Sequence, residues 1–397
     1  MNTIKFYTLG CKVNQYETQQ MRERFLGRGF KEVFGGERAD TYVINTCTVT
    51  HKADSESLNL LRRAERESPS AKIIVTGCLA ELDWDKIKKT ARGCLIVKNR
   101  DKKNISSAGI SYFAGRSRAF LKIQDGCDNF CSYCKVPLVR GKSKSKPLGD
   151  IIKEAERLVQ NDYKEIVLTG ICLGFYGREL KPKKSLVGVI KGLEKITGLL
   201  RIRLSSIEPQ DITDGLIKKI ANSAKLCRHL HIPLQSGDDA ILKKMNRKYT
   251  SAEYLNLIKK IKRRIPGITI TTDVLVGFPG ETEENFNNTR KLLAKIKPLK
   301  AHIFPYSKRE GTLSARFKDE IPPQVIKRRV AVLKAFADAC ALKCIKQSLN
   351  KARDVLIEGP SKKGPFLWEG YTDNYIKVCL KSRKNLTNRL VDTNSHE

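Results

Sequence analysis

Residues 125–141 read DGCDNFCSYCKVPLVRG and carry three cysteines, Cys127, Cys131 and Cys134, in one short segment. The spacing Cys-x-x-x-Cys-x-x-Cys follows a run predicted to be a strand, Phe120–Ile123. A structural zinc site takes four ligands, and no further cysteine or histidine lies nearby in the sequence. Iron–sulfur clusters are held by cysteine thiolates, usually four, so three thiolates leave one iron open. The segment therefore predicts an iron–sulfur cluster whose open iron binds a cofactor or substrate.

From the strand before this segment to about residue 305, six strand-like runs alternate with helical segments. The runs are Phe120–Ile123, Glu165–Thr169, Arg201–Ser205, His229–Leu234, Ile268–Val276 and Ala301–Phe304. Consecutive β/α units build a parallel sheet, and six of them predict an open or partial (β/α)6 TIM-like barrel. Functional residues are then expected at the carboxyl ends of the strands.

The first 98 residues also alternate strand and helix. Strands are predicted at Ile4–Leu9, Thr41–Thr46 and Lys72–Gly77, and helices at Gln15–Gly27 and Thr50–Glu67. Strands separated by helices predict a doubly wound parallel α/β domain.

Each of the three predicted N-terminal strands is followed closely by a cysteine: Cys11, Cys47 and Cys78. The carboxyl ends of neighbouring parallel strands share one edge of a sheet, roughly 5 Å apart per strand, so the three thiols can converge. Glycine precedes Cys11 and Cys78, which suits a backbone that turns closely around a bulky ligand. The spacing alone leaves two interpretations open, a second cluster or three buried cysteines that act as small hydrophobes.

Three more segments complete the chain. Residues 99–118 are polar and predict a linker, and Ile321–Leu349 predicts one long basic helix after a proline pair. Beyond residue 352, short β-like runs with glycine turns predict a small all-β barrel. The predicted units are 1–98, 99–118, 119–347 and 348–397.

The composition points to a polyanionic partner. Lysine and arginine total 76 against 42 acidic residues, a net charge of +34, and neutralised phosphates release counterions and add affinity. A general effect on solubility is the alternative. The 12 cysteines indicate metal or redox chemistry rather than disulfides in a reducing compartment. No secretory signal and no apolar run of the roughly 18 residues that a membrane helix needs are found, so we expect a cytoplasmic protein without membrane contact.

With both triads in place, the chain resembles the methylthiotransferase family of radical S-adenosylmethionine (SAM) enzymes. The matching segments are TLGCKVNQYET (8–18), NTCTVT (45–50), VTGCLAE (75–81), DGCDNFCSYCKVPLVRG (125–141) and WEGYTDNYIKV (368–378). The resemblance implies an N-terminal methylthiotransferase domain, a radical SAM core and a C-terminal TRAM domain, which is a small OB-like RNA-binding barrel. It also implies two 4Fe-4S clusters, an auxiliary one on Cys11, Cys47 and Cys78 and a SAM-binding one on Cys127, Cys131 and Cys134.

The segment after the first cysteine distinguishes branches of the family. Lys12-Val13-Asn14 is most similar to the branch that acts on N6-threonylcarbamoyladenosine (t6A) at tRNA position 37. The isopentenyladenosine branch usually has Gln-Met-Asn there, and the branch that modifies a ribosomal-protein side chain has Pro-Lys-Asn. Both remain alternatives, and a non-catalytic RNA-binding iron–sulfur redox sensor is an alternative of another class.

The resemblance implies catalysis through all six cysteines. SAM is cleaved to a 5′-deoxyadenosyl radical at the core cluster, and a methylthio group is transferred from the auxiliary cluster to C2 of the adenine in the anticodon loop. C2–H is too inert for acid–base or nucleophilic chemistry, so a cofactor-derived radical is required. The electron donor and the sulfur donor are not identified by the sequence.

Strand-end residues are the candidates for contact with SAM, by their similarity in position to the superfamily: Tyr133, Thr169, Gly170, Ser206, Glu208, Gln235 and Asp273. Helix capping or packing is the alternative role for Glu208 and Asp273, and His231 is expected to be packed inside its strand. Cys172 departs from the asparagine that relatives often have and is expected either near SAM or in packing. In the C-terminal segment, Trp368 is expected in the core of the small barrel.

Overall fold

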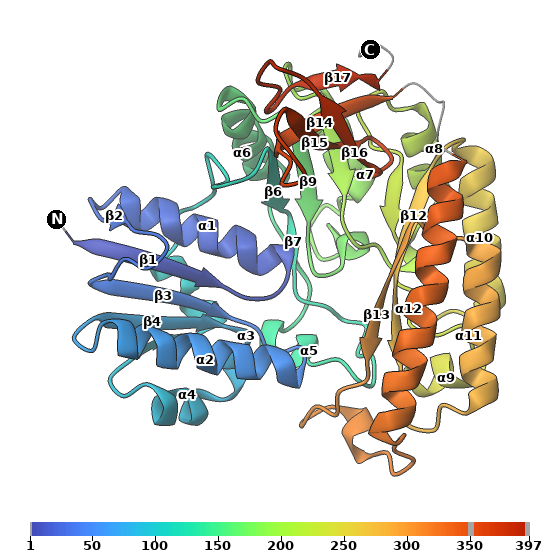
Figure 1. Cartoon of the computed structure of the whole chain (residues 1–397), viewed down its shortest axis with the longest axis horizontal. Coiled ribbons are helices and arrows are strands. Elements are labelled where there is room, and N and C mark those ends of the chain that lie inside the picture. Colours follow the sequence, from blue (N-terminus) through green and yellow to red (C-terminus); the bar gives the residue numbers. More distant parts are fainter. Residues whose placement is uncertain (1, 348–352, 394–397) are drawn as a thin grey trace.

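The N-terminal domain is a parallel five-stranded sheet in the order β2-β1-β3-β4-β5. The computed structural model describes residues 2–347 and 353–393. The strands are β1 (Thr3–Thr8), β2 (Lys31–Glu32), β3 (Thr41–Thr46), β4 (Lys72–Gly77) and β5 (Leu95–Val97). The helices are α1 (Lys12–Leu26), α2 (His51–Glu67), α3 (Cys78–Leu82) and α4 (Trp84–Thr90). Helix α1 lies on one side of the sheet, and α2 and α4 lie on the other (Figure 1).

Strand β3 shows why this sheet is doubly wound. All six of its residues are buried, as expected for a parallel strand that is covered on both faces. Val43 packs with Met21 and Phe25 of α1, whereas Tyr42 and Ile44 pack in the cluster of α2. Successive side chains of a strand point to opposite faces, so one continuous apolar run serves two helical layers.

The core contains the six predicted β/α units. Its strands are β6 (Arg118–Lys122), β9 (Glu165–Thr169), β10 (Arg201–Leu204), β11 (His229–His231), β12 (Thr269–Val276) and β13 (Lys300–Pro305). They form two parallel sheets, β10-β9-β6 and β11-β12-β13. Isolated β-bridges, such as the one between Ser206 and His231, join the two sheets into one curved wall. Among the described residues β6 and β13 do not pair, so the barrel is open between them, and α1 packs against β6 at that edge. The predicted partial barrel is confirmed.

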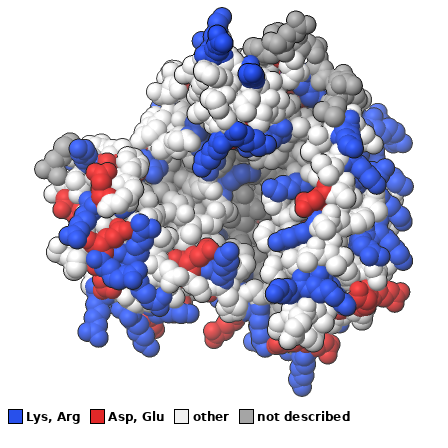
Figure 2. Space-filling model, in the orientation of Figure 1, with Lys and Arg blue, Asp and Glu red and all other residues white. Residues whose placement is uncertain are grey.

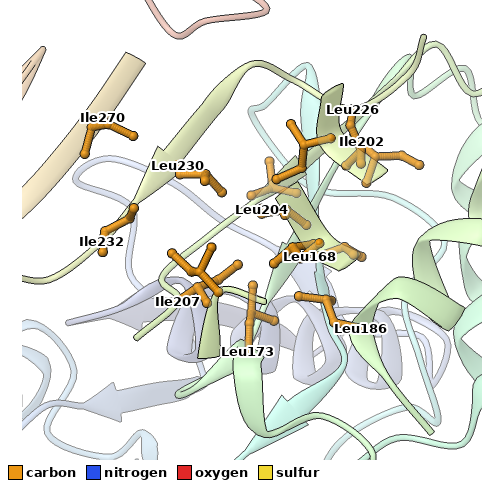
Figure 3. Packing of buried hydrophobic residues seen from close by; sticks show 14 of the residues in the cluster. Leu168, Leu173, Leu186, Ile202, Leu204, Ile207, Leu226, Leu230, Ile232 and Ile270 are labelled. Atoms are coloured by element: carbon orange, nitrogen blue, oxygen red, sulfur yellow. The ribbon is translucent and has the colours of Figure 1, made fainter. Parts of the chain in front are cut away.

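Helices cover the outside of this wall. They are α6 (Leu148–Gln160), α7 (Leu186–Glu194), α8 (Asp214–Asn222), α9 (Asp239–Lys244), α10 (Ser251–Arg264), α11 (Glu283–Ile296) and α12 (Pro323–Lys346). The short elements of the core are β7 (Gln124–Asp125), β8 (Lys144–Ser145) and α5 (Val136–Arg140). Leucine and isoleucine side chains from β9, β10 and β11 meet between the layers, as Leu168, Leu204 and Leu230 show (Figure 3).

Strand β11 ends earlier than the predicted run to Leu234. Pro233 has no backbone N–H to donate to a sheet, and Gln235 has a positive φ of 64° that no extended strand allows. The chain therefore turns at the carboxyl end of the strand.

The segment predicted as a linker, 99–118, is packed rather than loose. It begins with a 3-10 helix, Asn99–Asn104, and Ile110 and Phe113 are buried in the main core cluster. The Ser111 backbone N–H donates to the Glu23 carboxylate of α1 at 2.8 Å. The segment thus fastens α1 to the core.

The C-terminal part is an antiparallel sheet in the order β16-β15-β14-β17. Its strands are β14 (Asp354–Pro360), β15 (Leu367–Thr372), β16 (Lys377–Lys381) and β17 (Leu390–Asp392). Trp368 packs on its small core, as predicted, and donates from Nε1 to the Ser382 carbonyl at 3.0 Å. The last residues of the predicted helix Ile321–Leu349, and the predicted domain start at 348, lie outside the described residues. No helix in the described part of the chain could cross a membrane.

Candidate active site

The three N-terminal cysteines lie at adjacent strand ends. Cys11 follows β1 and starts α1, Cys47 follows β3, and Cys78 follows β4 as the first residue of α3. The parallel register pairs Thr8 with Asn45 and Thr46 with Gly77. Cys47 and Cys78 are buried, and Cys11 is exposed. Because the register is even across β1, β3 and β4, the cysteines share one edge of the sheet, as predicted from their spacing.

Two glycines make this close approach possible. Gly10 and Gly77 have φ angles of +94° and +98°, which favour glycine. A Cβ atom at Gly10 would lie 2.9 Å from Cys47 Sγ, and one at Gly77 would lie 2.3 Å from the Thr46 carbonyl oxygen. Any larger residue at either position would displace the end of β3, which carries Cys47.

Side chains fix the loops around these cysteines. Asn14 Nδ2 donates to the carbonyls of Leu9 and Thr46 at 2.8 and 3.0 Å, and Ser57 Oγ donates to the Cys47 carbonyl at 3.1 Å. Burial raises the pKa of Cys47 to about 11 and also raises the pKa of Cys78. Two buried thiols therefore need a positive centre to become thiolates, and the irons of a cluster supply one.

The 127–134 loop brings donors to its own sulfurs. The backbone N–H groups of Asn129 and Val136 point at the sulfurs of Cys127 and Cys134, at 3.5 and 3.4 Å. Arg247 Nη1 donates to Cys131 Sγ at 3.3 Å. These donors favour thiolates, but burial still raises the pKa of Cys131 and raises that of Cys134 to about 12, so this triad also needs a positive centre such as the irons of a cluster.

The donor chemistry of the two triads can be compared with that of known metal sites. Within residues 2–347 and 353–393, no three His, Cys, Asp or Glu side chains are placed around a single metal ion. The thiolates of an iron–sulfur cluster bind separate irons, so they lie farther apart than the ligands of one ion. Three cysteines in each triad are the donor type that iron–sulfur clusters take, so the donor sets fit the predicted clusters.

One cavity of about 400 Å³ joins the two triads. Its wall includes Cys11 from the sheet edge and Cys134 from the loop, together with the predicted SAM contacts Tyr133, Gln235 and Asp273. Its other lining residues are Val49, Thr50, Lys135, Val136, Leu275, Phe304, Pro305, Tyr306 and Ser307. One cysteine of each triad thus faces a shared space with a largely apolar wall, which suits radical chemistry shielded from water.

The other four predicted SAM contacts lie outside that wall. Thr169 Oγ1 donates to the Val167 carbonyl, and Gly170 packs closely on the Gln124 side chain. Ser206 forms a backbone bridge with His231. Glu208 is paired with Arg247, which in turn bonds Cys131.

Several site residues carry no motif in the sequence. Arg247 links Glu208 to Cys131, and the Cys172 thiol donates to Asp211 Oδ2 at 3.6 Å and lowers the pKa of the neighbouring Cys127. His231 does not simply pack: it bonds Asp273 Oδ2 at 3.0 Å and Thr271 Oγ1 at 2.9 Å. These contacts join residues from separate strands and loops, so only the tertiary structure brings them together.

A buried ion network ties the N-terminal domain to the core beneath the cavity. Arg140 Nη1 contacts Glu17 of α1 at 2.6 Å and Asp125 at 3.1 Å, and Lys102 and Lys122 also pair with Glu17. Burial alone would raise the pKa of Glu17, but the charges of Arg140, Lys102 and Lys122 hold it well below its usual range. This network joins helix α1, which begins next to Cys11, to the segment that carries the second triad.

The aromatic residues of the C-terminal sheet face the core instead of the solvent. Tyr371 and Tyr375 stack at 5.0 Å between ring centroids. Arg118 lies 4.7 Å from the Tyr371 ring and Arg203 lies 4.8 Å from the Tyr375 ring. These tyrosines therefore hold the domain against the start of the barrel strands.

Comparison with known proteins agrees with this geometry. Residues 121–293 match the Radical SAM superfamily, and residues 3–98 match a family described as uncharacterized, UPF0004. The chain is 39% identical to the threonylcarbamoyladenosine tRNA methylthiotransferase MtaB of Bacillus subtilis, over 98% of this chain and 93% of that protein. The chain belongs to the tRNA methylthiotransferase family of radical SAM proteins.

Other relatives lie in the same family or share its fold. The Thermotoga maritima MtaB is 36% identical over 95% of this chain and 91% of its own length. The tRNA-2-methylthio-N(6)-dimethylallyladenosine synthase of Carboxydothermus hydrogenoformans is 33% identical over 97% and 94%. Among solved structures, the radical SAM methyltransferase TsrM of Kitasatospora setae matches with a TM-score of 0.52 at 13% identity, over 77% of this chain and 73% of that one, which shows a shared fold.

Proposed function

We propose that this chain is a tRNA methylthiotransferase that adds a methylthio group to C2 of t6A at position 37, in the anticodon loop. The observation that carries the proposal is the single cavity lined by Cys11 of one triad and Cys134 of the other. Transfer of sulfur to a carbon that has lost its hydrogen requires both sites to reach one base. Near full-length similarity to two MtaB proteins supports t6A as the substrate.

The cofactors are SAM and two 4Fe-4S clusters. Cys127, Cys131 and Cys134 would hold the cluster that binds SAM, and Cys11, Cys47 and Cys78 would hold the auxiliary cluster. When bound, these groups supply the 5′-deoxyadenosyl radical and the methylthio sulfur. The chain itself positions them: Arg247 donates to Cys131, and the Arg140–Glu17 network holds the two domains together.

The cavity residues have distinct tasks in this proposal. Tyr133, Gln235 and Asp273 contact SAM, because they line the shared space beside Cys134. Glu208 acts through Arg247 and is a positioning residue. Thr169, Gly170 and Ser206 shape the strand ends that SAM meets.

The domain assignment follows the same division. Residues 1–98 form the methylthiotransferase domain, 99–118 the linker, 119–347 the radical SAM core, and 348–397 a TRAM domain that binds tRNA. A hollow lies in the middle of the face in Figure 2, between the N-terminal domain and the core, with lysines and arginines along its rim. With a net charge of +34, such a rim suits the phosphates of an anticodon loop whose bases are unpaired. A cytoplasmic location fits this substrate.

The test is nucleoside mass spectrometry of tRNA from a host that lacks methylthiotransferases and expresses this chain. We expect 2-methylthio-t6A. Appearance of 2-methylthio-isopentenyladenosine in its place would keep the chemistry and overturn the substrate. No methylthio nucleoside from protein with its full iron and sulfide would favour the ribosomal-protein substrate or the non-catalytic redox sensor.

A further inference from the structure

Lys12 follows Cys11 directly and lies at the open edge of the barrel. It is the first residue of α1, and its Nζ is 5.9 Å from the centroid of the Phe120 ring on β6. It interacts electrostatically with Asp273 on β12 and with His302 on β13. Cys11 and Asp273 both line the shared cavity. Lys12 therefore follows a residue of the cavity wall and places its ammonium near the Phe120 ring of β6.

No carboxylate neutralises this ammonium. Within residues 2–347 and 353–393, Lys12 forms no ion pair within 4.0 Å, and Asp273 already accepts a hydrogen bond from His231. The charges that act on Lys12 are mainly cationic, from Arg118, Arg203 and Arg116. The first turn of a helix is also an unfavourable place for a cation because of the helix dipole.

The nearby arginines differ from Lys12 in having partners. Arg118 pairs with Glu358 at 2.7 Å and Arg203 with Glu165 at 2.6 Å. Arg116 is exposed, donates to Gln15 and lies 5.2 Å from the Phe120 centroid, on the outer side of the opening. Lys12 is thus the inner, unneutralised cation of this opening, and the place is built for an anion.

We propose that Lys12 binds the carboxylate of the threonyl group of t6A, an inference that rests on the proposed function. On adenine, C2 and C6 flank the same ring nitrogen and C6 bears the substituted N6, so a base whose C2 faces the auxiliary site holds its threonyl group close by. Lys12 is adjacent to Cys11 on the sheet-edge side of the cavity, whereas Lys135 follows Cys134 on the side of the SAM-binding triad. The isopentenyladenosine branch usually has glutamine at this position, and an isopentenyl group has no charge to neutralise.

A backbone phosphate is the other anion that the RNA offers. Phosphates lie along the outside of an RNA loop, and the exposed Arg116 is better placed for them than Lys12. The two sources predict different behaviour, because a phosphate is present in every RNA and the carboxylate only in t6A.

The test measures binding of three anticodon stem–loop RNAs to the cluster-loaded full chain without oxygen. Position 37 carries t6A, its threoninamide analogue without the carboxylate, or unmodified adenosine. We expect the natural chain to bind the t6A RNA about tenfold more tightly than the amide RNA, as for a charge-assisted contact. Lys12→Gln should bind both equally, Lys12→Arg should restore most of the preference, and Lys72→Gln, at an exposed position at the far end of β4, should keep all of it.

Two results would overturn the proposal. Equal weakening of all three RNAs by Lys12→Gln would assign Lys12 to a phosphate, and an unchanged preference for t6A would remove Lys12 from recognition. Iron content and circular dichroism confirm that each variant is folded and loaded. The proposed function fails separately: if the natural chain prefers t6A through Lys12 but makes no methylthio nucleoside, only the activity is wrong.

Discussion

The two cysteine triads reach the same cavity by different routes. Cys127, Cys131 and Cys134 belong to one loop, and backbone N–H groups of that loop point at two of the sulfurs. Cys11, Cys47 and Cys78 are brought together only by the register of β1, β3 and β4. A local site depends on the conformation of a few residues, whereas a dispersed site depends on the integrity of a whole sheet. The two should therefore fail in different ways.

Loss of a ligand from each triad gives the largest contrast. We expect Cys131→Ala to abolish formation of 5′-deoxyadenosine from SAM by the reduced enzyme. Cys47→Ala should retain this cleavage and form no methylthio nucleoside. Each loss should exceed the roughly 10–100-fold effect of removing a supporting contact to a metal ligand. Chromatography of 5′-deoxyadenosine and mass spectrometry of nucleosides measure the two activities.

The exposed Cys379 of β16 provides the matched control. Cys379→Ala should keep both activities. Methylthio product from Cys47→Ala would show that the sheet-edge triad is not the sulfur site.

The contrast between local and dispersed features also explains which parts of the fold could be predicted from the sequence. The strands Thr41–Thr46, Lys72–Gly77 and Glu165–Thr169 are predicted with the bounds that β3, β4 and β9 have. They are nearly continuous apolar runs because both faces of each strand are covered. The predicted strand bounds are therefore correct where several consecutive residues are buried. They are wrong at β11, where a proline and a positive φ end the strand.

The site divides in the same way. The cysteines are found from spacing, whereas Lys12 and Arg140 lie in the matching segments without a role assigned by the sequence, and Arg247 lies in none of them. Arg247 meets Cys131 from a separate helix-flanking loop, and Arg140 meets Glu17 across the domain boundary. Lone charges are usually solvated, so a sequence cannot show which of 76 basic residues becomes part of a site.

A methyl group at Gly77 should damage only the dispersed triad. The positive φ costs an alanine about 1–3 kcal/mol, and its Cβ would lie 2.3 Å from the Thr46 carbonyl oxygen, so the end of β3 must move. We expect Gly77→Ala to lose one of the two 4Fe-4S clusters, and therefore roughly half of the iron and sulfide. The variant should keep SAM cleavage. Iron analysis and 5′-deoxyadenosine formation measure these effects.

Gly36 offers a control in the same domain. A Cβ there meets nothing within 4 Å, and its φ is not positive. Gly36→Ala should keep all its iron, and a full iron content in Gly77→Ala would mean that the sheet edge tolerates a shift of β3.

Loss of the ion network around Arg140 should have a smaller effect on activity than loss of a ligand from either triad. Arg140→Met leaves Glu17 and Asp125 with fewer cations in a buried place, which costs about 3 kcal/mol. We expect lower stability in urea at pH 7, with both clusters still loaded. Because the pKa of Glu17 is held low in the folded chain, this stabilisation is present above the unfolded pKa of about 4.3 and is lost as the pH falls further. The free energies of unfolding of the natural chain and of Arg140→Met should therefore converge on acidification, and a constant difference down to pH 3 would contradict this account.

The smallest effect tests whether the sheet alone places Cys47. Thr50 caps α2 by accepting a hydrogen bond from the Ala53 N–H at 3.1 Å, only three residues beyond the cysteine. Thr213 caps α8 in the same way, by accepting from the Leu216 N–H at 3.2 Å, far along the chain from the triad. Loss of such a cap costs about 1 kcal/mol, so Thr50→Ala and Thr213→Ala should lower the free energy of unfolding equally and leave the iron content unchanged. If Thr50→Ala alone loses iron, the loop after β3 also positions Cys47, together with the register of the strands. The dispersed triad would then depend partly on local structure and not on the sheet alone.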